Sequence, residues 1–204
     1  MSKTLIVDYG MGNLGSVRRA FEECGADVFI SGNPSDISVA DHIVLPGVGA
    51  FADGMTALNA AGWVDALRRS TTEMIPLLGI CLGMQLLADR GFEGGETEGL
   101  GLIPGEVRRL EPDSAETRIP HVGWNEVHPR CANPLFSAIA EGTDFYFVHS
   151  YHFIPLTADD IAATTPYCGT FVSALNRGTV FGTQFHPEKS SRAGFQVIRN
   201  FLAL

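Results

Sequence analysis

Short, continuously apolar runs alternate with amphipathic helical patterns through the first half of this 204-residue chain, and this alternation constrains its fold most. Uninterrupted apolar runs of strand length are typical of parallel strands covered on both faces. We expect such strands at Thr4–Val7, Val28–Ile30, His42–Leu45 and Pro76–Ile80. We expect helices over Ser16–Cys24, Phe51–Ala60, Trp63–Arg69 and Leu82–Ala88. This order predicts an α/β sheet with right-handed connections.

The pattern changes after Gly91. Residues 92–99 are acidic and glycine-rich, which predicts a loop. Later runs predict antiparallel or mixed strands at Glu106–Leu110, Trp124–Val127, Asp144–His149, Thr170–Leu175 and Thr179–Gln184. An amphipathic helix ends the chain. We therefore predict one α/β domain over residues 1–204, a mostly parallel central sheet flanked by helices with an antiparallel portion in the C-terminal half.

Composition narrows the class of protein. Hydrophobic residues make up 45% of the chain and the formal net charge is −9, so we expect a globular protein that does not bind nucleic acid. The longest apolar stretch, Met74–Leu82, is too short to cross a membrane. The cysteines form no Cys-x-x-Cys pair, which predicts free thiols in a reducing cytoplasm and no metal site. These cysteines are Cys24, Cys81, Cys131 and Cys168.

A cysteine stands where a buried strand runs directly into a helix. Gly79 and Gly83 flank Cys81 two residues on either side, the spacing of a nucleophile elbow with sulfur in place of the serine oxygen. The sharp turn leaves no space for Cβ atoms beside the nucleophile. A helix N-terminus favours a thiolate, and the N–H of Leu82 points to where an oxyanion would form. We therefore predict a nucleophile at Cys81 rather than a buried structural thiol.

A cysteine nucleophile needs a base, and the base needs a group that orients it. His186 and Glu188 follow the strand Thr179–Gln184, and residues two apart on an extended chain project to the same side. Pro187 keeps the residue before it extended. We therefore predict that Glu188 holds one ring nitrogen of His186 while the other faces Cys81.

Two glycine-rich turns leave alternatives open. Gly47, Val48 and Gly49 follow the strand His42–Leu45, where they supply either oxyanion donors, a phosphate cradle or an ordinary strand–helix turn. The segment Gly10–Gly15 matches G-x-G-x-x-G between a strand and a helix, which is the context of dinucleotide binding. However, no acidic residue closes the second strand to hold a ribose, since Asp36 lies beyond a turn at Pro34.

Taken together, these motifs resemble those of the class I (triad) glutamine amidotransferases. The segments around Cys81 and over Phe185–Glu188 resemble the family's two catalytic motifs. Further segments are similar to those of the glutaminase subunits of imidazole glycerol phosphate synthases. These are Asp8–Leu14, Pro46–Gly49, Pro120–Asn125, Phe147–Tyr151 and Gln184–Ser190. The resemblance covers nearly the whole chain, although residues 111–117 match nothing assignable.

The resemblance implies that Cys81 attacks the amide carbon of glutamine, that His186 transfers protons and that Glu188 orients His186. It also implies an oxyanion hole formed by Gly47–Gly49 with Leu82. Residues that hold the amino-acid end of glutamine are Gln85, Glu93, His149, Ser150 and Tyr151. The implied partner is a (β/α)₈-barrel cyclase that forms a heterodimer, receives the ammonia and acts in histidine biosynthesis. Residues implied to face it are Gly10–Asn13, Gly123, Trp124, Asn125, Tyr146 and Lys189.

Three hypotheses of function therefore stand. The first is a cysteine glutaminase that needs no cofactor and passes ammonia to this cyclase. The second keeps the Cys81, His186 and Glu188 set but places it in another amidotransferase or in a stand-alone γ-glutamyl hydrolase. The third is a non-catalytic dinucleotide-binding module built on Gly10–Gly15.

Overall fold

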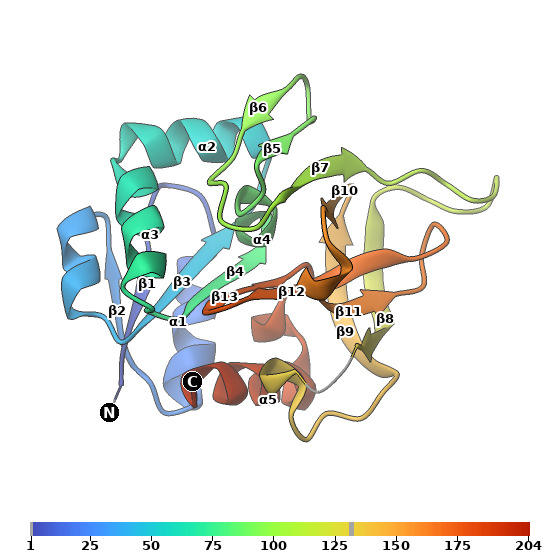
Figure 1. Cartoon of the computed structure of the whole chain (residues 1–204). Helices are drawn as coiled ribbons and strands as arrows, with labels where there is room; N and C mark the ends of the chain where they lie inside the picture. The colour runs from blue at the N-terminus through green and yellow to red at the C-terminus, as the bar shows by residue number, and fades with distance from the viewer. Residues whose placement is uncertain (1, 131–132) are drawn as a thin grey trace.

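A nine-stranded sheet organises the computed structural model, which describes residues 2–130 and 133–204 (Figure 1). Its strands are β1 (Lys3–Val7), β2 (Asp27–Ser31), β3 (His42–Gly47), β4 (Leu77–Cys81), β8 (His121–Pro129), β9 (Thr143–His149), β11 (Ile161–Thr165), β12 (Phe171–Arg177) and β13 (Val180–Thr183). They lie in the order β2-β1-β3-β4-β13-β12-β11-β8-β9. The first five strands in this order are parallel, and each later strand is antiparallel to its neighbour. The predicted parallel sheet with an antiparallel portion is confirmed.

A second, four-stranded sheet stands beside the first in the order β10-β7-β5-β6. Its strands are β5 (Arg90–Gly91), β6 (Thr97–Glu98), β7 (Gly105–Arg109) and β10 (Tyr151–Pro155). The prediction of an uninterrupted loop over residues 92–99 is wrong at Thr97–Glu98, because these residues pair with Arg90–Gly91. The strand expected at Glu106–Leu110 exists but belongs to this second sheet, since its partner β10 leaves the central sheet after Ser150.

Helices cover both faces of the central sheet. In Figure 1, α1 and α5 lie on one face and α2 and α3 on the other. Their bounds, with those of the short α4, are α1 (Leu14–Glu23), α2 (Phe51–Ala60), α3 (Trp63–Thr72), α4 (Leu82–Leu86) and α5 (Ser191–Leu202). The 3₁₀ turns are η1 (Pro34–Val39), η2 (Pro134–Phe136), η3 (Ala158–Asp160) and η4 (Pro187–Lys189).

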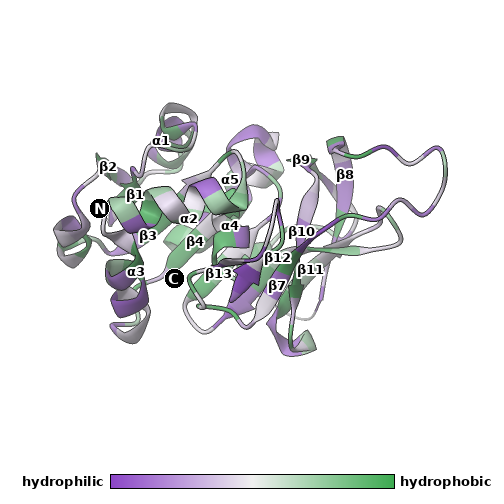
Figure 2. Ribbon diagram, turned by 90° about the horizontal axis from the view of Figure 1, so that it is seen from above, coloured by the Kyte–Doolittle hydropathy of each residue, from purple (hydrophilic) through white to green (hydrophobic). Residues whose placement is uncertain are grey.

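The core has two apolar layers, one on each face of the sheet. Leu5 packs into the layer under α2 and α3, whereas its neighbour Ile6 packs into the layer under α1 and α5. This alternation explains why the central residues of the parallel strands are apolar on both faces. Figure 2 shows the same concentration of apolar residues along β4 and α4 in the middle of the molecule. β4 lies between the two layers, and the apolar side chains of α4 pack into the layer under α2 and α3, so the junction of β4 and α4 is buried in the core.

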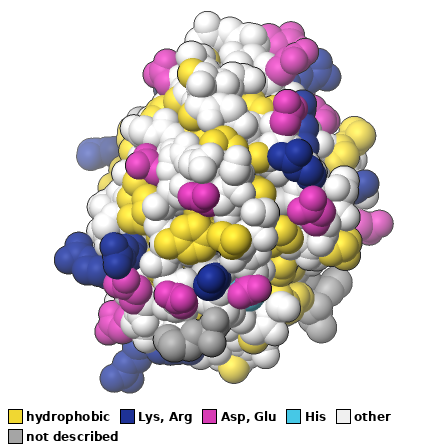
Figure 3. All heavy atoms as spheres, turned by 90° about the vertical axis from the view of Figure 1, so that its left-hand side faces the viewer, with side chains coloured by type: hydrophobic (Ala, Val, Ile, Leu, Met, Phe, Trp, Pro, Cys, Tyr) yellow, Lys and Arg dark blue, Asp and Glu magenta, His cyan; other side chains and the backbone are white. Residues whose placement is uncertain are grey.

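The surface carries charges of both signs. On the face shown in Figure 3, Lys and Arg side chains lie among Asp and Glu side chains rather than in one continuous basic area. Within residues 2–130 and 133–204, no helix combines the length and the apolar character that crossing a bilayer demands.

Candidate active site

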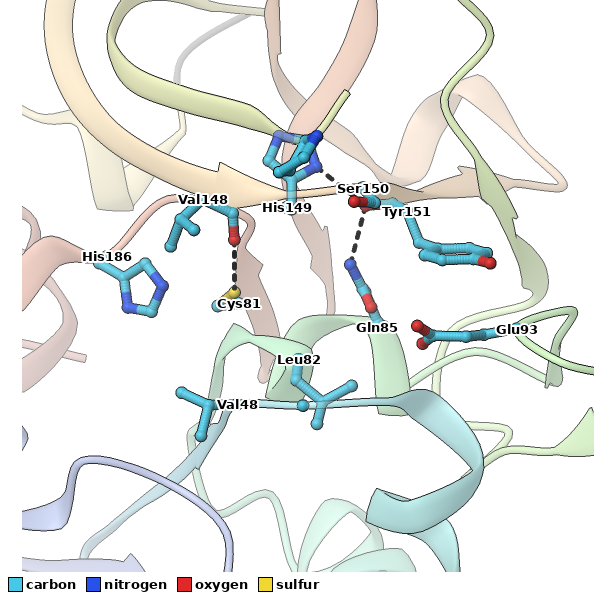
Figure 4. A pocket seen from close by; sticks show the side chains of 12 residues that line it. Val48, Cys81, Leu82, Gln85, Glu93, Val148, His149, Ser150, Tyr151 and His186 are labelled. Carbon is cyan, nitrogen blue, oxygen red and sulfur yellow. Dashed lines mark hydrogen bonds between the residues drawn. The ribbon is translucent and has the colours of Figure 1, made fainter. Parts of the chain in front are cut away.

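A cavity of about 340 Å³ opens at the carboxyl end of β4, where ligands bind in parallel α/β sheets (Figure 4). It is lined by Val48, Gly49, Cys81, Leu82, Gln85, Glu93, Pro120, Val148, His149, Ser150, Tyr151 and His186. The cavity therefore brings together Cys81, His186 and all five residues implied to hold glutamine. The sequence motifs predicted no role for Pro120 and Val148. They line the cavity because Pro120 directly precedes β8 and Val148 lies on β9.

The strand–helix junction has the geometry of a nucleophile elbow. Cys81 ends β4 with φ +55° and ψ −110°, a backbone conformation that residues with a Cβ rarely adopt. A Cβ on Gly79 would lie 2.6 Å from the Gly83 carbonyl oxygen, and a Cβ on Gly83 would lie 1.8 Å from the Leu45 carbonyl oxygen. Both glycines are therefore required, as predicted. The helix after Cys81 ends at Leu86, two residues before the expected Ala88.

Gly47 lies beside the elbow but does not line the cavity. It is paired with Cys81 in the β3–β4 register, and a Cβ here would lie 2.5 Å from the Tyr9 hydroxyl. That hydroxyl donates a hydrogen bond to the Pro46 carbonyl at 2.9 Å. Burial, together with the nearby Cys81, raises the pKa of Tyr9, so its hydroxyl remains a donor at neutral pH. Gly47 thus makes room for Tyr9, while Val48 and Gly49 reach the cavity wall.

His186 and Glu188 form a buried pair. The His186 Nδ1 lies 2.8 Å from Glu188 Oε1, and the other ring nitrogen, Nε2, has no hydrogen-bond partner among the described residues. Burial lowers the pKa of His186, but Cys81 and Glu188 outweigh it and raise that pKa to about 9. His186 and Glu188 pair as expected, but the backbone between them differs from the prediction. Residues Pro187–Lys189 form a 3₁₀ turn rather than extended chain, because Pro187 starts that turn as its first residue.

The backbone around His186 is also held on both sides. Its N–H donates to the Tyr146 carbonyl at 3.0 Å, and its carbonyl accepts from the Ser190 hydroxyl at 2.7 Å. The same hydroxyl accepts from the Tyr146 N–H at 3.0 Å. Lys189 lies over the Tyr146 ring, 5.9 Å from its centroid. Tyr146 and Ser190 therefore fix where the imidazole stands relative to the elbow.

The sulfur atom contacts two polar groups for which the sequence analysis predicted no role. Cys81 Sγ lies 3.9 Å from the Val148 carbonyl oxygen, and Gln184 Nε2 donates to Sγ at 3.8 Å. Gln184 Oε1 in turn accepts from Gln85 Nε2 at 3.0 Å. The position of Gln184 one residue beyond a buried strand, two residues before His186, is the signal that would have found it.

The far wall of the cavity carries the remaining polar groups. Glu93 Oε2 accepts from the Phe51 N–H at 2.9 Å, which satisfies the otherwise uncapped start of α2. His149 Nδ1 lies 2.9 Å from the Tyr151 carbonyl oxygen, and Gln85 Nε2 donates to the same oxygen at 2.9 Å. Burial lowers the pKa of His149 to about 3, so it stays neutral beside Cys81 while His186 carries the proton.

The residues expected to face a partner occupy different environments. Trp124 is 53% exposed and packs edge-on against Tyr146, while Val122 and Val148 on the same two strands are 58% and 37% exposed. Asn125 points the other way, since its Nδ2 donates to the Pro166 carbonyl at 3.2 Å and lies 3.3 Å from His121 Nε2.

The Gly10–Gly15 segment joins β1 to α1, as its pattern predicts. Gly10 has φ +87°, and its N–H donates to Asp8 Oδ1 at 3.1 Å. Asn13 caps α1 by accepting from the Ser16 N–H at 3.3 Å. This turn is thus closed by its own polar side chains. Among the residues that the structure describes, no three His, Cys, Asp or Glu side chains are grouped to hold a metal ion.

Comparison with known structures supports the fold. A chain of PurLQS from Thermotoga maritima superposes with a TM-score of 0.77 at 18% identity, covering 100% of this chain and 99% of that one. A glutamine amidotransferase from Thermotoga maritima gives a TM-score of 0.67 at 19% identity, covering 99% and 83%. At these identities the likeness concerns the fold alone.

Sequence comparison carries the assignment further. The model of the class-I glutamine amidotransferase family matches residues 5–204. The imidazole glycerol phosphate synthase subunit HisH of Moorella thermoacetica is 48% identical over 201 residues, covering 98% of this chain and 94% of that protein. The HisH subunit of Chromobacterium violaceum is 46% identical over 208 residues, covering 98% and 97%. The resemblance inferred from the motifs is confirmed: this chain belongs to the class I glutamine amidotransferases and, within them, to the HisH subunits of imidazole glycerol phosphate synthases.

Proposed function

We propose that Cys81, His186 and Glu188 form a catalytic triad that hydrolyses glutamine to glutamate and ammonia. The observation that carries this proposal is that one cavity holds both the Cys81 thiol, on its strained elbow, and the His186 imidazole. Buried Glu188 holds Nδ1 of this imidazole, and Nε2 has no hydrogen-bond partner among the described residues. A nucleophile, a base and an orienting carboxylate are the three parts of such a triad.

Hydrolysis proceeds through a thioester. The Cys81 thiolate attacks the amide carbon, and the pair of electrons displaced from the C=O bond forms an oxyanion, which the N–H of Leu82 and the backbone of Val48 and Gly49 would stabilise. Gly47, which does not line the cavity, would support them from behind. When the C–N bond breaks, protonated His186 gives its proton to the departing nitrogen and ammonia leaves. Neutral His186 then takes a proton from water, whose oxygen attacks the thioester carbon and releases glutamate and the thiolate.

The cavity suits a small polar amino acid. Its volume of about 340 Å³ is at the lower end of the range for small-molecule sites. Glu93 and the Ser150–Tyr151 backbone are the groups that would hold the α-amino and α-carboxylate ends of glutamine, with Gln85 and His149 fixing that wall. The amide end would then reach Cys81 at the other side of the cavity.

The ammonia needs a protected route, because in neutral water it becomes protonated and loses its nucleophilicity. We propose that a (β/α)₈-barrel cyclase subunit covers the cavity and receives it for imidazole glycerol phosphate synthesis, in the cytoplasm. The apolar side chains exposed beside the cavity suit such a contact. They are Val48, Val122, Trp124 and Val148. Gly10, Asn13, Asn125, Tyr146 and Lys189 would complete the heterodimer interface.

Covalent labelling tests the nucleophile. A glutamine-analogue alkylator should modify Cys81, and excess glutamine should protect it, as mapped by mass spectrometry. Cys24 and Cys168, which are partly exposed free thiols, are internal controls whose labelling should not respond to glutamine. Labelling that avoids Cys81, or that glutamine leaves unchanged, would contradict the proposal.

Activity measurements test the partner. The isolated chain should hydrolyse glutamine slowly, and addition of the cyclase with its nucleotide ligand should accelerate hydrolysis sharply. Trp124→Ala should weaken this acceleration without changing glutamine protection of Cys81. High turnover by the chain alone would instead favour a stand-alone γ-glutamyl hydrolase.

A further inference from the structure

A row of buried polar side chains leads away from the cavity wall toward β8. His149 lines the cavity, and its Nε2 lies 3.1 Å from Nδ1 of His121, the residue directly opposite it in the β8–β9 register. His121 Nε2 lies 3.3 Å from Nδ2 of Asn125. His121 is only 4% exposed and does not line the cavity. The proposed catalytic mechanism gives no role to His121.

One acceptor fixes the direction of every hydrogen bond in the row. The Tyr151 carbonyl can only accept, so His149 Nδ1, at 2.9 Å, carries a hydrogen and donates it. In a neutral ring the other nitrogen of His149 is then an acceptor, so His121 Nδ1 must be the donor between the two rings. His121 Nε2 is left as an acceptor, and it faces the amide nitrogen of Asn125, which donates.

The charge states agree with this assignment. Burial lowers the pKa of His121 to about 4 and the pKa of His149 to about 3, so both rings are neutral at pH 7. Each neutral ring has one donor and one acceptor, and each is used. A proton added to either ring would place two N–H groups in opposition, which the row cannot accommodate.

Aromatic neighbours hold the His121 ring in its plane. The Tyr167 ring stacks on it with centroids 3.9 Å apart, and the Phe147 ring stacks at 5.0 Å. The Tyr167 hydroxyl donates to the Arg118 carbonyl, which anchors the stack to the segment before β8. His121 therefore presents its Nδ1 to His149 in one orientation.

The other end of the row reaches the residues proposed to bind glutamine. The Tyr151 carbonyl accepts from His149 Nδ1 and also from Gln85 Nε2. We propose that His121 is a positioning residue: it holds His149 in the Nδ1-protonated tautomer, and through the Tyr151 carbonyl it keeps Gln85 and the Ser150–Tyr151 wall in the geometry that binds glutamine. This inference rests on the proposed glutaminase function.

Two substitutions of His121 distinguish a role in positioning His149 from a role in packing alone. His121→Leu fills the space but removes the donor, whereas His121→Asn places an amide N–H where Nδ1 stands and should rescue. The half-protecting concentration of glutamine against Cys81 alkylation should rise about three- to tenfold in the leucine variant, the effect of losing about one hydrogen bond. It should stay within about twofold of wild type in the asparagine variant. Equal protection in all three proteins, or equal loss in both variants, would overturn the proposal.

Nuclear magnetic resonance of isotope-labelled histidine tests the tautomer in the unmodified protein, independently of any activity. His149 should show a protonated Nδ1 and an unprotonated Nε2 between pH 6 and pH 8, and His121 should show the same tautomer. An Nε2-protonated or charged His149 would overturn the proposal. If Cys81 is unlabelled by the glutamine analogue while the tautomer is as stated, the glutaminase function fails and the hydrogen-bonded row remains.

Discussion

His186 Nδ1 lies 2.8 Å from Glu188 Oε1, and the two side chains are only 4% and 2% exposed. A carboxylate at this distance stabilises the imidazolium and fixes which nitrogen faces Cys81. Glu188→Gln should therefore lower turnover by about 10²-fold or more, the typical contribution of general acid–base catalysis. The alkaline limb of the pH–rate profile should also move to lower pH, because the pKa of His186 falls when the carboxylate is lost.

A matched pair on the surface gives the control. His128 Nε2 lies 3.2 Å from Glu126 Oε1, but these side chains are 36% and 46% exposed and lie outside the cavity. Glu126→Gln should leave both turnover and the pH profile unchanged. An equal effect of the two substitutions would show that the buried pair has no special role.

The stability of the fold should depend on pH through the same imidazole. The pKa of His186 is raised to about 9, against about 6.5 for an unperturbed histidine. Its contribution to the free energy of unfolding is therefore fully present below about pH 6.5 and is lost as the pH rises through 9. The loss is at most about 3 kcal/mol. Urea unfolding at pH 6 and pH 9.5 should show this difference in wild type and a smaller one in His186→Asn.

Much of the fold followed from sequence periodicity. The parallel strands were predictable because both of their faces are covered, so β1, β3 and β4 are apolar at nearly every position. Four strands were not predicted: the two-residue strands Arg90–Gly91 and Thr97–Glu98, and the longer strands Tyr151–Pro155 and Ile161–Thr165. The strand Tyr151–Pro155 carries a mixed pattern and pairs with a distant segment, Gly105–Arg109, which no local signal identifies as its partner. For this reason the second sheet was absent from the prediction.

The residues of the site likewise differ in how far they could be predicted from the sequence. Cys81 was predictable because a strained elbow imposes glycines at fixed spacing, and that requirement is local in sequence. His121 contacts His149 on another strand, so its role depends on the register of β8 with β9. Gln184 contacts Cys81, so its role depends on the path of the chain after β13. The pairing of His186 with Glu188 was expected, but the turn that produces it was not.

Gln184 offers a test of how the sulfur is stabilised. It is fully buried and donates through Nε2 to Cys81 Sγ, while Gln85 fixes the orientation of its amide. Gln184→Met keeps the size but removes the donor, so the thiolate loses a stabilising contact. Alkylation of Cys81 at pH 7 should therefore slow by up to about tenfold, equivalent to about 1.4 kcal/mol.

Two measurements check that this loss of reactivity is local. Alkylation of Cys168 in the same sample should keep its rate, and Gln196→Met, on α5, should leave the alkylation rate of Cys81 unchanged. Gln196 serves as the matched control because its amide donates to Asn200, away from the cavity. An unchanged rate of Cys81 alkylation in Gln184→Met would mean that the 3.8 Å contact contributes nothing to the reactivity of the sulfur.

Two glycine-to-alanine substitutions should act in opposite directions. A Cβ on Gly83 would lie 1.8 Å from the Leu45 carbonyl oxygen, so β3 and α4 must separate to admit it. We expect Gly83→Ala to lower the free energy of unfolding by about 3 kcal/mol, the upper end of the typical cost of overpacking, because the atom that the Cβ meets belongs to the backbone. Around Gly15, inside α1, a Cβ meets nothing within 4 Å. Gly15→Ala should raise stability by up to about 1 kcal/mol because alanine has less backbone entropy to lose. Urea unfolding measures both changes. A mild effect at Gly83 would mean that the elbow can relax, and the need for glycine beside Cys81 would then lie in catalysis rather than in packing.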